Sequence, residues 1–373
     1  MPAPCEQVIA FVLAAVAWGE LLPRVDPVRV GHKQIVHGSS KLELHTLALK
    51  PPIFHIPGFL SADEARDVLA IAQSQSTQSS EGLQESVVKN SCTETRGGGD
   101  LLRFDEDGDG RLGFDDLLVI ALVCYNLVDF DETIYTNLLE SLGDKHVDGE
   151  DIIVTSRGLS ALVDKFLADV VRTEPHRKAR YSRTGWMQYG QSDLLLAVRQ
   201  RAMEITGWPE DVMNATEDLQ LVHYPTLGHY SCHYDANLEH MEAKRVLRLA
   251  TLGIFLNDVE SGGELAFPAA DAVNLSIPDI RALELECQET EMCTELGGVV
   301  VQPRQGDAVL WYNVELEQFS MADTSTPGFA EQVLSWESVH CGARVHAGNK
   351  WFANMWFRLP KDDKWWPRGK REL

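Results

Sequence analysis

The segment LQLVHYPTLGHYSCHYD, residues Leu219 to Asp235, opens a region of short apolar runs in the C-terminal half of a 373-residue chain. Comparable runs follow as RLATLGIFLND (248–258), GGVVVQPRQGDAVLWYNV (297–314) and KWFANMWFRL (350–359). These runs are rich in branched and aromatic residues and are separated by Gly, Pro, Asn and Asp, which is typical of β-strands joined by turns. Several short strands of this kind predict a β-sandwich or jelly roll.

Two segments before this region have helical patterns instead. In LSADEARDVLAIAQSQ (60–75), Ser61 and Glu64 have the spacing of a capping box, and apolar residues follow at helical intervals. This pattern predicts a helix over residues 62–76. The stretch SDLLLAVRQRAMEITGW (192–208) predicts an amphipathic helix capped by Ser192. The predicted fold class is therefore α+β, a jelly roll with supporting helices.

An acidic, glycine-containing loop, FDEDGDGRLGFDDL (104–117), lies between the two predicted helices. Its spacing is that of an EF-hand calcium loop, in which hard oxygen ligands surround a hard cation and a glycine at position 6 makes the sharp turn. The loop positions 1, 3, 5, 7 and 12, which supply ligands, fall on Asp105, Asp107, Asp109, Arg111 and Asp116. The alternative, a chance acidic turn, does not account for the glycine and the apolar residue at position 8.

The calcium loop departs from the usual pattern at its last position. Asp116 stands where a longer Glu usually binds through both oxygens, so we expect weak affinity, with a Kd of roughly 10⁻⁴ M. A second loop, GDKHVDGEDIIV (143–154), has its apolar residue one place late and Thr155 at its twelfth position. We interpret residues 95–160 as an inserted α-helical EF-hand pair, with an exiting helix over 117–127 and a degenerate second hand that binds calcium poorly or not at all.

A metal site of another kind is indicated by His233 and Asp235. They follow a strand, where residues two apart face the same side and can share one metal. His340 precedes a glycine-containing turn, and Lys350 lies ten residues further on. Two histidines and one carboxylate are the ligand set of non-haem Fe(II) oxygenases. The alternative is a structural His–Asp pair, since the sequence has another such pair, His146 and Asp148, within the degenerate hand.

The charge of the protein limits its partners. It has 56 acidic and 33 basic residues and a formal net charge of -23. Such a balance argues against a phosphate-binding surface, so nucleic acid is not an expected partner. An acidic excess could attract cationic ligands or could simply keep the protein soluble.

Both ends of the sequence have features of the secretory pathway. The apolar run over 8–19 is too short to span a bilayer, which needs about 20 residues, and Ala15 and Ala17 offer a cleavage pattern. We interpret residues 1–19 as a signal peptide; a signal anchor, the one expected route to membrane attachment, and a buried helix are the alternatives. Residues 362–373 form a tail whose last four residues, KREL, resemble the KDEL retrieval signal. Asn214 and Asn274 begin glycosylation sequons, so the prediction is a glycoprotein of the endoplasmic reticulum lumen.

Cysteine usage is compatible with that compartment. Six cysteines remain after Cys5, and in an oxidising environment they allow fifteen disulfide connectivities. Cys287 and Cys293 are the favoured pair because they bracket a short loop. The alternative for all six is a set of buried thiols.

Four motifs carry a family resemblance. HYPTLGHYSCHYD, RLATLGIFLNDVESGGELAFP, QPRQGDAVLWYN and SVHCGARVHAGNKWFANMW occur in the order found in the catalytic domain of prolyl 4-hydroxylases. The sequence resembles this family from Val30 to about Pro360. The resemblance implies a double-stranded β-helix and a 2-oxoglutarate-dependent dioxygenase that uses Fe(II), O2 and ascorbate. It places the enzyme domain at 20–361, with its core at 176–361, interrupted by the EF-hand pair.

The resemblance also implies roles for individual residues. Iron would be held by His233, Asp235 and His340. Lys350 would bind the distal carboxylate of 2-oxoglutarate, and Tyr224 would contact the same co-substrate. The groove for a proline-containing protein or peptide would be lined by Tyr230, Arg248 and Trp356.

The sequence departs from the family at Leu265, which stands where family members commonly have a threonine, so co-substrate affinity could be weaker. The function inferred from the sequence is hydroxylation of prolyl residues at the 4-position, by an enzyme that also binds calcium. Two alternatives remain open. One is a catalytically idle oxygenase fold that serves as a calcium-binding platform, and the other is a hydroxylase of a different side chain.

Overall fold

The computed structural model describes residues 22–39, 41–78, 84–85, 101–105, 107–153, 157–272, 274–286 and 298–367. The expected signal segment, the Cys287–Cys293 loop and the KREL end lie outside these residues. In the part that is described, no helix combines the length and the apolar character needed to cross a membrane.

Within the described residues, the larger of two main sheets has nine strands, and all neighbouring strands are antiparallel. Their order across the sheet is β1 (Lys33–His37), β2 (Lys41–Leu49), β3 (Pro52–Ile56), β16 (Ala308–Tyr312), β12 (Arg248–Phe255), β19 (Lys350–Arg358), β10 (Leu219–Tyr224), β9 (Arg183–Met187) and β4 (Gln84–Glu85). Three of the apolar runs from which strands were predicted thus lie side by side as β10, β19 and β12. The fourth run contributes β16 to this sheet and β15 to the other.

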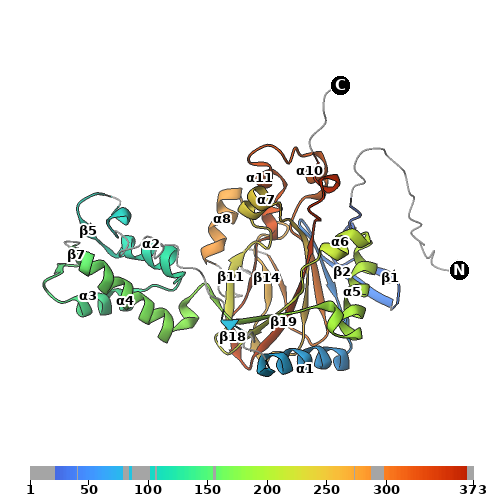
Figure 1. Cartoon of the computed structure of the whole chain (residues 1–373), viewed down its shortest axis with the longest axis horizontal. Coiled ribbons are helices and arrows are strands. Elements are labelled where there is room, and N and C mark those ends of the chain that lie inside the picture. Colours follow the sequence, from blue (N-terminus) through green and yellow to red (C-terminus); the bar gives the residue numbers. More distant parts are fainter. Residues whose placement is uncertain are drawn as a thin grey trace.

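The smaller sheet has the order β15 (Val299–Val301), β14 (Leu265–Phe267), β17 (His340–Gly342), β11 (His229–His233) and β8 (Arg180–Tyr181). A short ladder also forms between β13 (Ser261–Gly262) and β18 (Val345–Ala347). Side chains from both main sheets, among them Val222, Phe255 and Phe352 of the larger and Leu265 and Phe267 of the smaller, form one buried cluster. The two sheets therefore face each other as a jelly roll, as predicted, and Figure 1 shows them enclosing the centre of the main domain.

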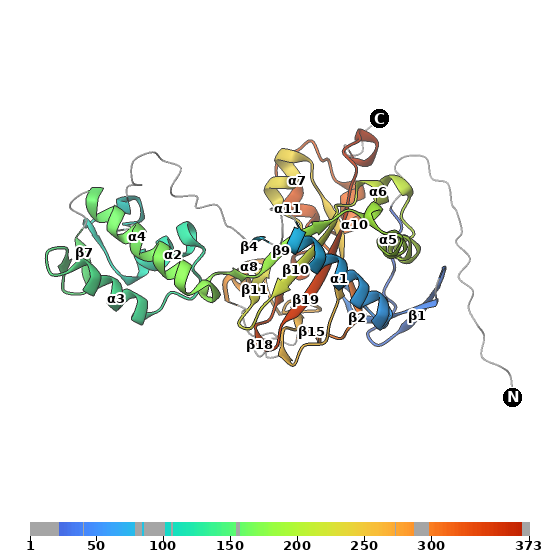
Figure 2. The same cartoon turned by 60° about the horizontal axis from the view of Figure 1, so that its bottom comes forward.

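Helices cover the other face of the larger sheet. Residues of α1 (Ala62–Gln78), α5 (Asp193–Thr206) and α6 (Glu210–Ala215) share a second apolar cluster with that face, and Figure 2 shows α1 lying across it. The capping box is present, because the Ser61 N–H donates to Glu64 Oε2 at 2.8 Å and the Glu64 N–H to Ser61 Oγ at 3.2 Å. Ser192 caps α5 by accepting from the Leu195 N–H. Both predicted helices are confirmed.

Four short helices lie near the sheets: α7 (Leu238–Lys244), α8 (Ile277–Glu286), α10 (Leu316–Met321) and α11 (Phe329–Val333). The first part of the expected C-terminal tail packs against this region. Trp366 is buried, its indole N–H donates to the Pro360 carbonyl at 2.8 Å, and Arg245 lies over its ring. The packing extends as far as Pro367, whose carbonyl accepts the Thr324 N–H at 2.9 Å.

The inserted segment forms a separate helical module with its own apolar cluster. It projects from one end of the main domain in both views (Figures 1 and 2). Its elements are η1 (Leu101–Phe104), β5 (Arg111–Leu112), α2 (Phe114–Tyr125), α3 (Glu132–Leu142), β6 (Val147–Asp148), β7 (Asp151–Ile153) and α4 (Arg157–Thr173). The exiting helix α2 begins at Phe114 rather than at the expected Leu117, because Asp116 accepts the Gly113 N–H at 3.0 Å and caps the helix earlier.

The two loops of the module pair through a short ladder. Leu112 of β5 lies opposite Ile152 of β7. The second loop additionally folds back on itself, since β6 pairs with β7 as a hairpin. The apolar residue of the second loop is thus Ile152, one place later than in a regular hand, as the sequence indicated.

The module returns to the main domain through residues 177–181. The Val128 N–H donates to the Arg177 carbonyl at 3.1 Å, and the Ala179 N–H donates to the Asn126 carbonyl at 3.0 Å. The backbone then enters β8, which pairs with β11 of the smaller sheet. The end of α2 is therefore connected by backbone hydrogen bonds to the strand beside the site described below.

Among the described cysteines, Cys124 of α2 is disulfide-bonded, whereas Cys232 and Cys341 are buried thiols in the main domain. Cys232 and Cys341, which flank candidate metal ligands, thus match the alternative of buried thiols, whereas Cys124 matches the expectation of a disulfide.

Candidate active site

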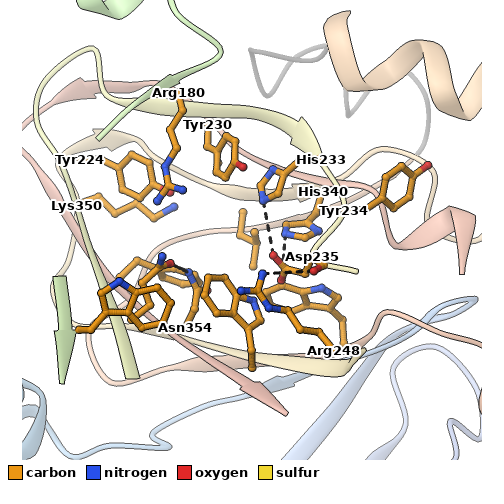
Figure 3. Close-up of a pocket in the computed structure, with 17 residues that line it drawn as sticks. Arg180, Tyr224, Tyr230, His233, Tyr234, Asp235, Arg248, His340, Lys350 and Asn354 are labelled. Carbon is orange, nitrogen blue, oxygen red and sulfur yellow. Dashed lines mark hydrogen bonds and ion pairs between the residues drawn. The ribbon is translucent and has the colours of Figure 1, made fainter. Parts of the chain in front are cut away.

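A single row of side chains on β19 runs through a pocket between the two sheets. Lys350, Phe352, Asn354 and Trp356 are two residues apart, face the same side of the strand and line the pocket (Figure 3). The opposite wall comes from the smaller sheet and the segment after it, with Tyr230, His233 and His340 among its residues. The pocket thus lies inside the jelly roll, where the sheets hold both walls in place.

The candidate metal ligands meet in this pocket. His233 ends β11 and His340 begins β17, and the two residues are directly opposite in the ladder. His233 Nε2 lies 3.8 Å from Asp235 Oδ1, and His340 Nε2 lies 3.6 Å from Asp235 Oδ2 (Figure 3). One ligand atom of each residue lies within 4.8 Å of the other two. Two imidazoles and one carboxylate at this spacing can coordinate one metal ion on one face.

The backbone fixes the orientation of both imidazoles. His233 Nδ1 lies 2.9 Å from the Ser231 carbonyl, and His340 Nδ1 lies 2.9 Å from the Ser338 carbonyl. A carbonyl can only accept, so each Nδ1 carries the hydrogen and each Nε2 presents its lone pair toward Asp235. Both rings therefore have the tautomer that a metal ligand requires.

The carboxylate is oriented by two residues that the sequence interpretation missed. Thr251 Oγ1 donates to Asp235 Oδ2 at 2.6 Å, and Asn313 Nδ2 donates to Thr251 Oγ1 at 3.0 Å. All three residues are buried. The available signal was weak: Thr251 is a lone hydroxyl in the apolar run of β12, and Asn313 directly follows the apolar run of β16.

Protonation states in this cluster suit a divalent cation. Burial, together with the neighbouring His340, lowers the pKa of His233 to about 3. Burial alone would raise the pKa of Asp235, but the attraction of His340, His233 and Arg248 outweighs it and the net shift is downward. A neutral imidazole and an ionised carboxylate are the forms that bind metal without first losing a proton.

Lys350 lies at the other end of the pocket in apolar surroundings. It is 2% exposed, and its Nζ lies 4.9 Å from the ring centroid of Phe352 and 5.2 Å from that of Tyr224. In the described part of the protein, no carboxylate lies within 4 Å of Nζ. Burial lowers the pKa of Lys350 to about 8, although the negative charge of Glu264 acts to raise it. A buried ammonium without a close counter-ion is costly, which indicates an anionic ligand at this position.

Tyr224 is the cross-strand neighbour of Lys350 in the β10–β19 ladder, and both side chains lie at the same end of the pocket (Figure 3). Burial raises the pKa of Tyr224 to about 12. Its hydroxyl thus remains protonated and can donate a hydrogen bond. Leu265, the departure noted in the sequence, also lines the pocket and brings no polar atom.

The three residues expected to line a peptide groove are all at the pocket. Tyr230 stacks on His233 with ring centroids 3.6 Å apart. The Arg248 guanidinium lies 3.5 Å from the Trp356 ring centroid, and its Nε and Nη2 donate to the two carboxylate oxygens of Glu217 at 2.8 and 2.9 Å. Arg248 is therefore paired with Glu217 and packs against the ring of Trp356. Glu217 was not identified from the sequence.

Two further pocket residues were also missed, Arg180 of β8 and Trp186 of β9. The Arg180 guanidinium lies over the Tyr230 ring at 4.5 Å, on the side of the pocket that holds Tyr224 and Lys350 (Figure 3). No motif contains either residue, so only their position in the sheets connects them with the site.

The structure brings together part of the expected calcium loop. One carboxylate oxygen of each of Asp105, Asp107 and Asp109 lies within 4.8 Å of the others. Asp116 is not part of this group, because its Oδ2 accepts the Gly113 N–H instead. The side chain of Arg111, whose carbonyl is the expected ligand, pairs with Asp148 of the second loop at 2.9 Å.

Comparisons with known proteins show which proteins this chain resembles. Residues 219–358 match the 2OG-Fe(II) oxygenase superfamily. The transmembrane prolyl 4-hydroxylase of Mus musculus is 27% identical over 363 residues, covering 91% of this chain and 70% of that protein. The Homo sapiens protein of the same name is 26% identical with the same coverage. A viral collagen prolyl hydroxylase from Paramecium Bursaria Chlorella virus-1, solved with 2OG, is 19% identical over 52% of this chain and 88% of that chain, with a TM-score of 0.33.

The profile match and the strand arrangement define residues 219–358 as a domain of the 2OG-Fe(II) oxygenase superfamily. This domain, together with relatives that are prolyl 4-hydroxylases, supports a 2-oxoglutarate- and Fe(II)-dependent dioxygenase of the prolyl hydroxylase type.

Proposed function

We propose that this enzyme hydroxylates prolyl residues of protein substrates at the 4-position, with His233, Asp235 and His340 as the iron ligands. The observation that carries the proposal is the arrangement of one pocket. Three metal-binding side chains meet at one position, and the buried Lys350 lies at the other end of the same pocket. The names of the relatives, which are prolyl 4-hydroxylases, support the choice of proline.

The residues fit the cofactor and the co-substrate. Both imidazoles direct Nε2 toward the ionised carboxylate, which leaves open positions on a bound cation. Lys350 would pair with the distal carboxylate of 2-oxoglutarate, and the Tyr224 hydroxyl would donate a hydrogen bond to it. Bound Fe(II) would supply the oxidative chemistry between 2-oxoglutarate, O2 and the substrate C–H bond.

The reaction balances without a further reactant. One oxygen atom of O2 enters the substrate as the hydroxyl, and the other enters succinate as 2-oxoglutarate loses CO2. The protein orients the reactants and excludes water. Tyr230, which stacks on His233, and Trp356, which packs against Arg248, would form rigid walls of the pocket for this purpose. Ascorbate, which the family resemblance implies, would keep the iron reduced when turnover is uncoupled from the substrate.

We also propose that the inserted module is an EF-hand pair that binds one calcium ion. The support is the group formed by Asp105, Asp107 and Asp109, with the ladder between the two loops. The backbone carbonyl of Arg111 and the carboxylate of Asp116 would complete the ligands. Residence in the endoplasmic reticulum, with glycosylation at Asn214 and Asn274, remains a proposal that rests on the sequence motifs.

The test is product analysis with purified enzyme, Fe(II), 2-oxoglutarate and candidate peptides. We expect succinate formation, and mass spectrometry should show a gain of one oxygen on proline. His340→Ala should abolish both products because it removes one iron ligand. Oxygen found only on other residues would reject prolyl hydroxylation. Absence of succinate together with retained calcium binding would support the calcium-binding platform instead.

A further inference from the structure

The helix α2 of the inserted module is apolar on all sides. From residue 117 to residue 125 it has nine consecutive apolar residues, LLVIALVCY. A surface helix of a globular protein usually has an apolar face toward the core and a polar face toward solvent, and a helix that is apolar all round is usually buried. The composition of α2 therefore indicates that each of its faces packs against something.

The structure covers one of these faces and leaves the other exposed. The inner face contributes five buried residues to the apolar cluster of the module: Leu117, Ile120, Ala121, Cys124 and Tyr125. The opposite side, which we call the outer α2 face, is formed by Leu118, Val119, Leu122 and Val123. Val119 is 46% exposed and Val123 is 50% exposed, whereas both leucines are half-buried. The outer α2 face thus leaves apolar surface in contact with water.

The outer α2 face has the geometry of a helix-packing surface. Leu118 and Leu122 are four residues apart, as are Val119 and Val123, so their side chains form two neighbouring rows along the helix. Rows of residues four apart are the ridges between which the side chains of a second helix pack. Because the inner face of α2 stays in the core of the module, docking here requires no opening of the helix pair, unlike the groove of a calcium sensor.

The charge of the module decides between the possible occupants. Residues 101–173 contain sixteen acidic and six basic residues. Asp115, which is exposed, begins the row that continues with Val119 and Val123. A second copy of the module would bring like charges together, and an anionic lipid surface would be repelled as well. A helix with an apolar face flanked by Lys and Arg fits both the apolar rows and the charge.

We propose that the outer α2 face is a docking site for a basic amphipathic helix of a partner protein. The apolar side of the partner helix covers the two rows, and its Lys and Arg side chains lie toward Asp115 and the other acidic residues of the module. The catalytic pocket is lined by residues of the main domain, so the partner and a substrate can bind at the same time. The proposal does not depend on prolyl hydroxylation.

The test measures the binding of two labelled peptides to the full-length enzyme by fluorescence anisotropy. The first is a helix of about 16 residues, roughly four turns, made of Leu, Lys and Ala with its leucines three and four residues apart. The second has the same composition in scrambled order, so it has the same charge without an apolar face. At physiological salt, which screens distant charges, we expect the Kd of the amphipathic peptide to be lower by about 10-fold or more.

Substitutions locate the binding site. The double substitution Val119→Asn and Val123→Asn should raise the Kd of the amphipathic peptide by about 10-fold or more, because two apolar side chains that the peptide covers become polar. Valine and asparagine have similar helix propensities, so α2 itself should persist. Asp115→Asn removes one flanking charge and should raise the same Kd about 2- to 3-fold. Leu196→Asn changes a 45% exposed apolar residue on α5 of the main domain and should have no effect.

Three results would overturn the proposal. The first is an equal Kd of both peptides for the unmodified enzyme, or an equal effect of the double substitution on both. The second is a dimer of the unmodified enzyme in sedimentation equilibrium that dissociates on double substitution, which would assign the outer α2 face to a second copy. The third is sedimentation with vesicles of anionic phospholipid that the double substitution abolishes, which would assign it to a lipid surface.

Discussion

The Thr251 hydroxyl donates to Asp235 Oδ2 at 2.6 Å, and this bond connects the two sheets of the jelly roll at the metal-binding cluster. Thr251 belongs to β12 of the larger sheet, whereas Asp235 follows β11 of the smaller one. The side chain of Asn313 supports the hydroxyl from the end of β16. The orientation of the one carboxylate in the cluster therefore depends on residues that do not themselves reach the metal position.

We expect Thr251→Val to weaken metal binding by about 10- to 100-fold, because the carboxylate loses the hydrogen bond that orients it. Val has nearly the shape of Thr, so packing should change little. Titration with Co(II), followed by visible absorption, measures the affinity directly. Thr46→Val is the matched control, because Thr46 is equally buried and its hydroxyl has no partner in the described structure. Equal Co(II) affinities of the two variants would show that Thr251 does not orient the ligand.

Binding of 2-oxoglutarate should weaken as pH rises through about 8. Burial lowers the pKa of Lys350 to about 8, so the side chain is a cation below that pH and becomes a neutral amine above it. Only the cation attracts the distal carboxylate, and with this pKa about a tenth of the lysine is charged at a pH of about 9. The apparent Kd should therefore rise about tenfold between pH values of about 7 and about 9.

Calorimetry with the Zn(II)-loaded enzyme measures this dependence without turnover. Pyruvate is the matched control ligand, since it has the same 2-oxo acid group without a distal carboxylate. Its affinity should follow only the pH dependence of the metal site. If both ligands show the same dependence, Lys350 does not hold the distal carboxylate.

The site residues that could be predicted from the sequence are those whose role follows from their spacing along the chain. His233 and Asp235 are two residues apart after a strand, and a strand places such side chains on one face. His340 and Lys350 were located by their spacing and by the family resemblance. The capping box of Ser61 similarly requires only four residues of sequence.

The missed residues act through contacts between segments that are distant in sequence. Glu217 pairs with Arg248 across 31 positions, and Trp186 reaches the pocket only because β9 lies beside β10. No local pattern encodes a strand order, so one sequence gives no signal for these residues. The start of α2 was placed three residues late for a different reason, because Asp116 was assigned to calcium and its role as a helix cap was overlooked.

The pair formed by Arg248 and Glu217 should contribute to stability as well as to the pocket. Lys at position 248 would keep the charge but lose the two-point contact with Glu217 and the planar stacking on Trp356. We expect Arg248→Lys to lower the free energy of unfolding by about 1–2 kcal/mol, measured by urea denaturation.

The protein offers a closely matched control for that substitution. Arg281 also lies over a tryptophan, Trp336, at 4.3 Å and pairs with Glu331 at 3.2 Å, but both charged side chains are about half exposed. Arg281→Lys should change the free energy of unfolding by less than about 0.5 kcal/mol. A loss as large as that of Arg248→Lys would mean that burial does not set the strength of these contacts.

Calcium affinity should increase when the last loop position is lengthened. Asp116 Oδ2 is engaged by the Gly113 N–H and lies outside the group of the other three carboxylates. A glutamate extends one methylene further and can bind the cation through both oxygens, so we expect Asp116→Glu to lower the calcium Kd at least tenfold from roughly 10⁻⁴ M. Calorimetric titration measures the change. Asp115→Glu adds the same methylene next to the loop position and should leave the Kd unaltered, whereas Asp105→Asn should abolish binding. An Asp116→Glu protein with unchanged affinity would refute the assignment of Asp116 as the twelfth ligand.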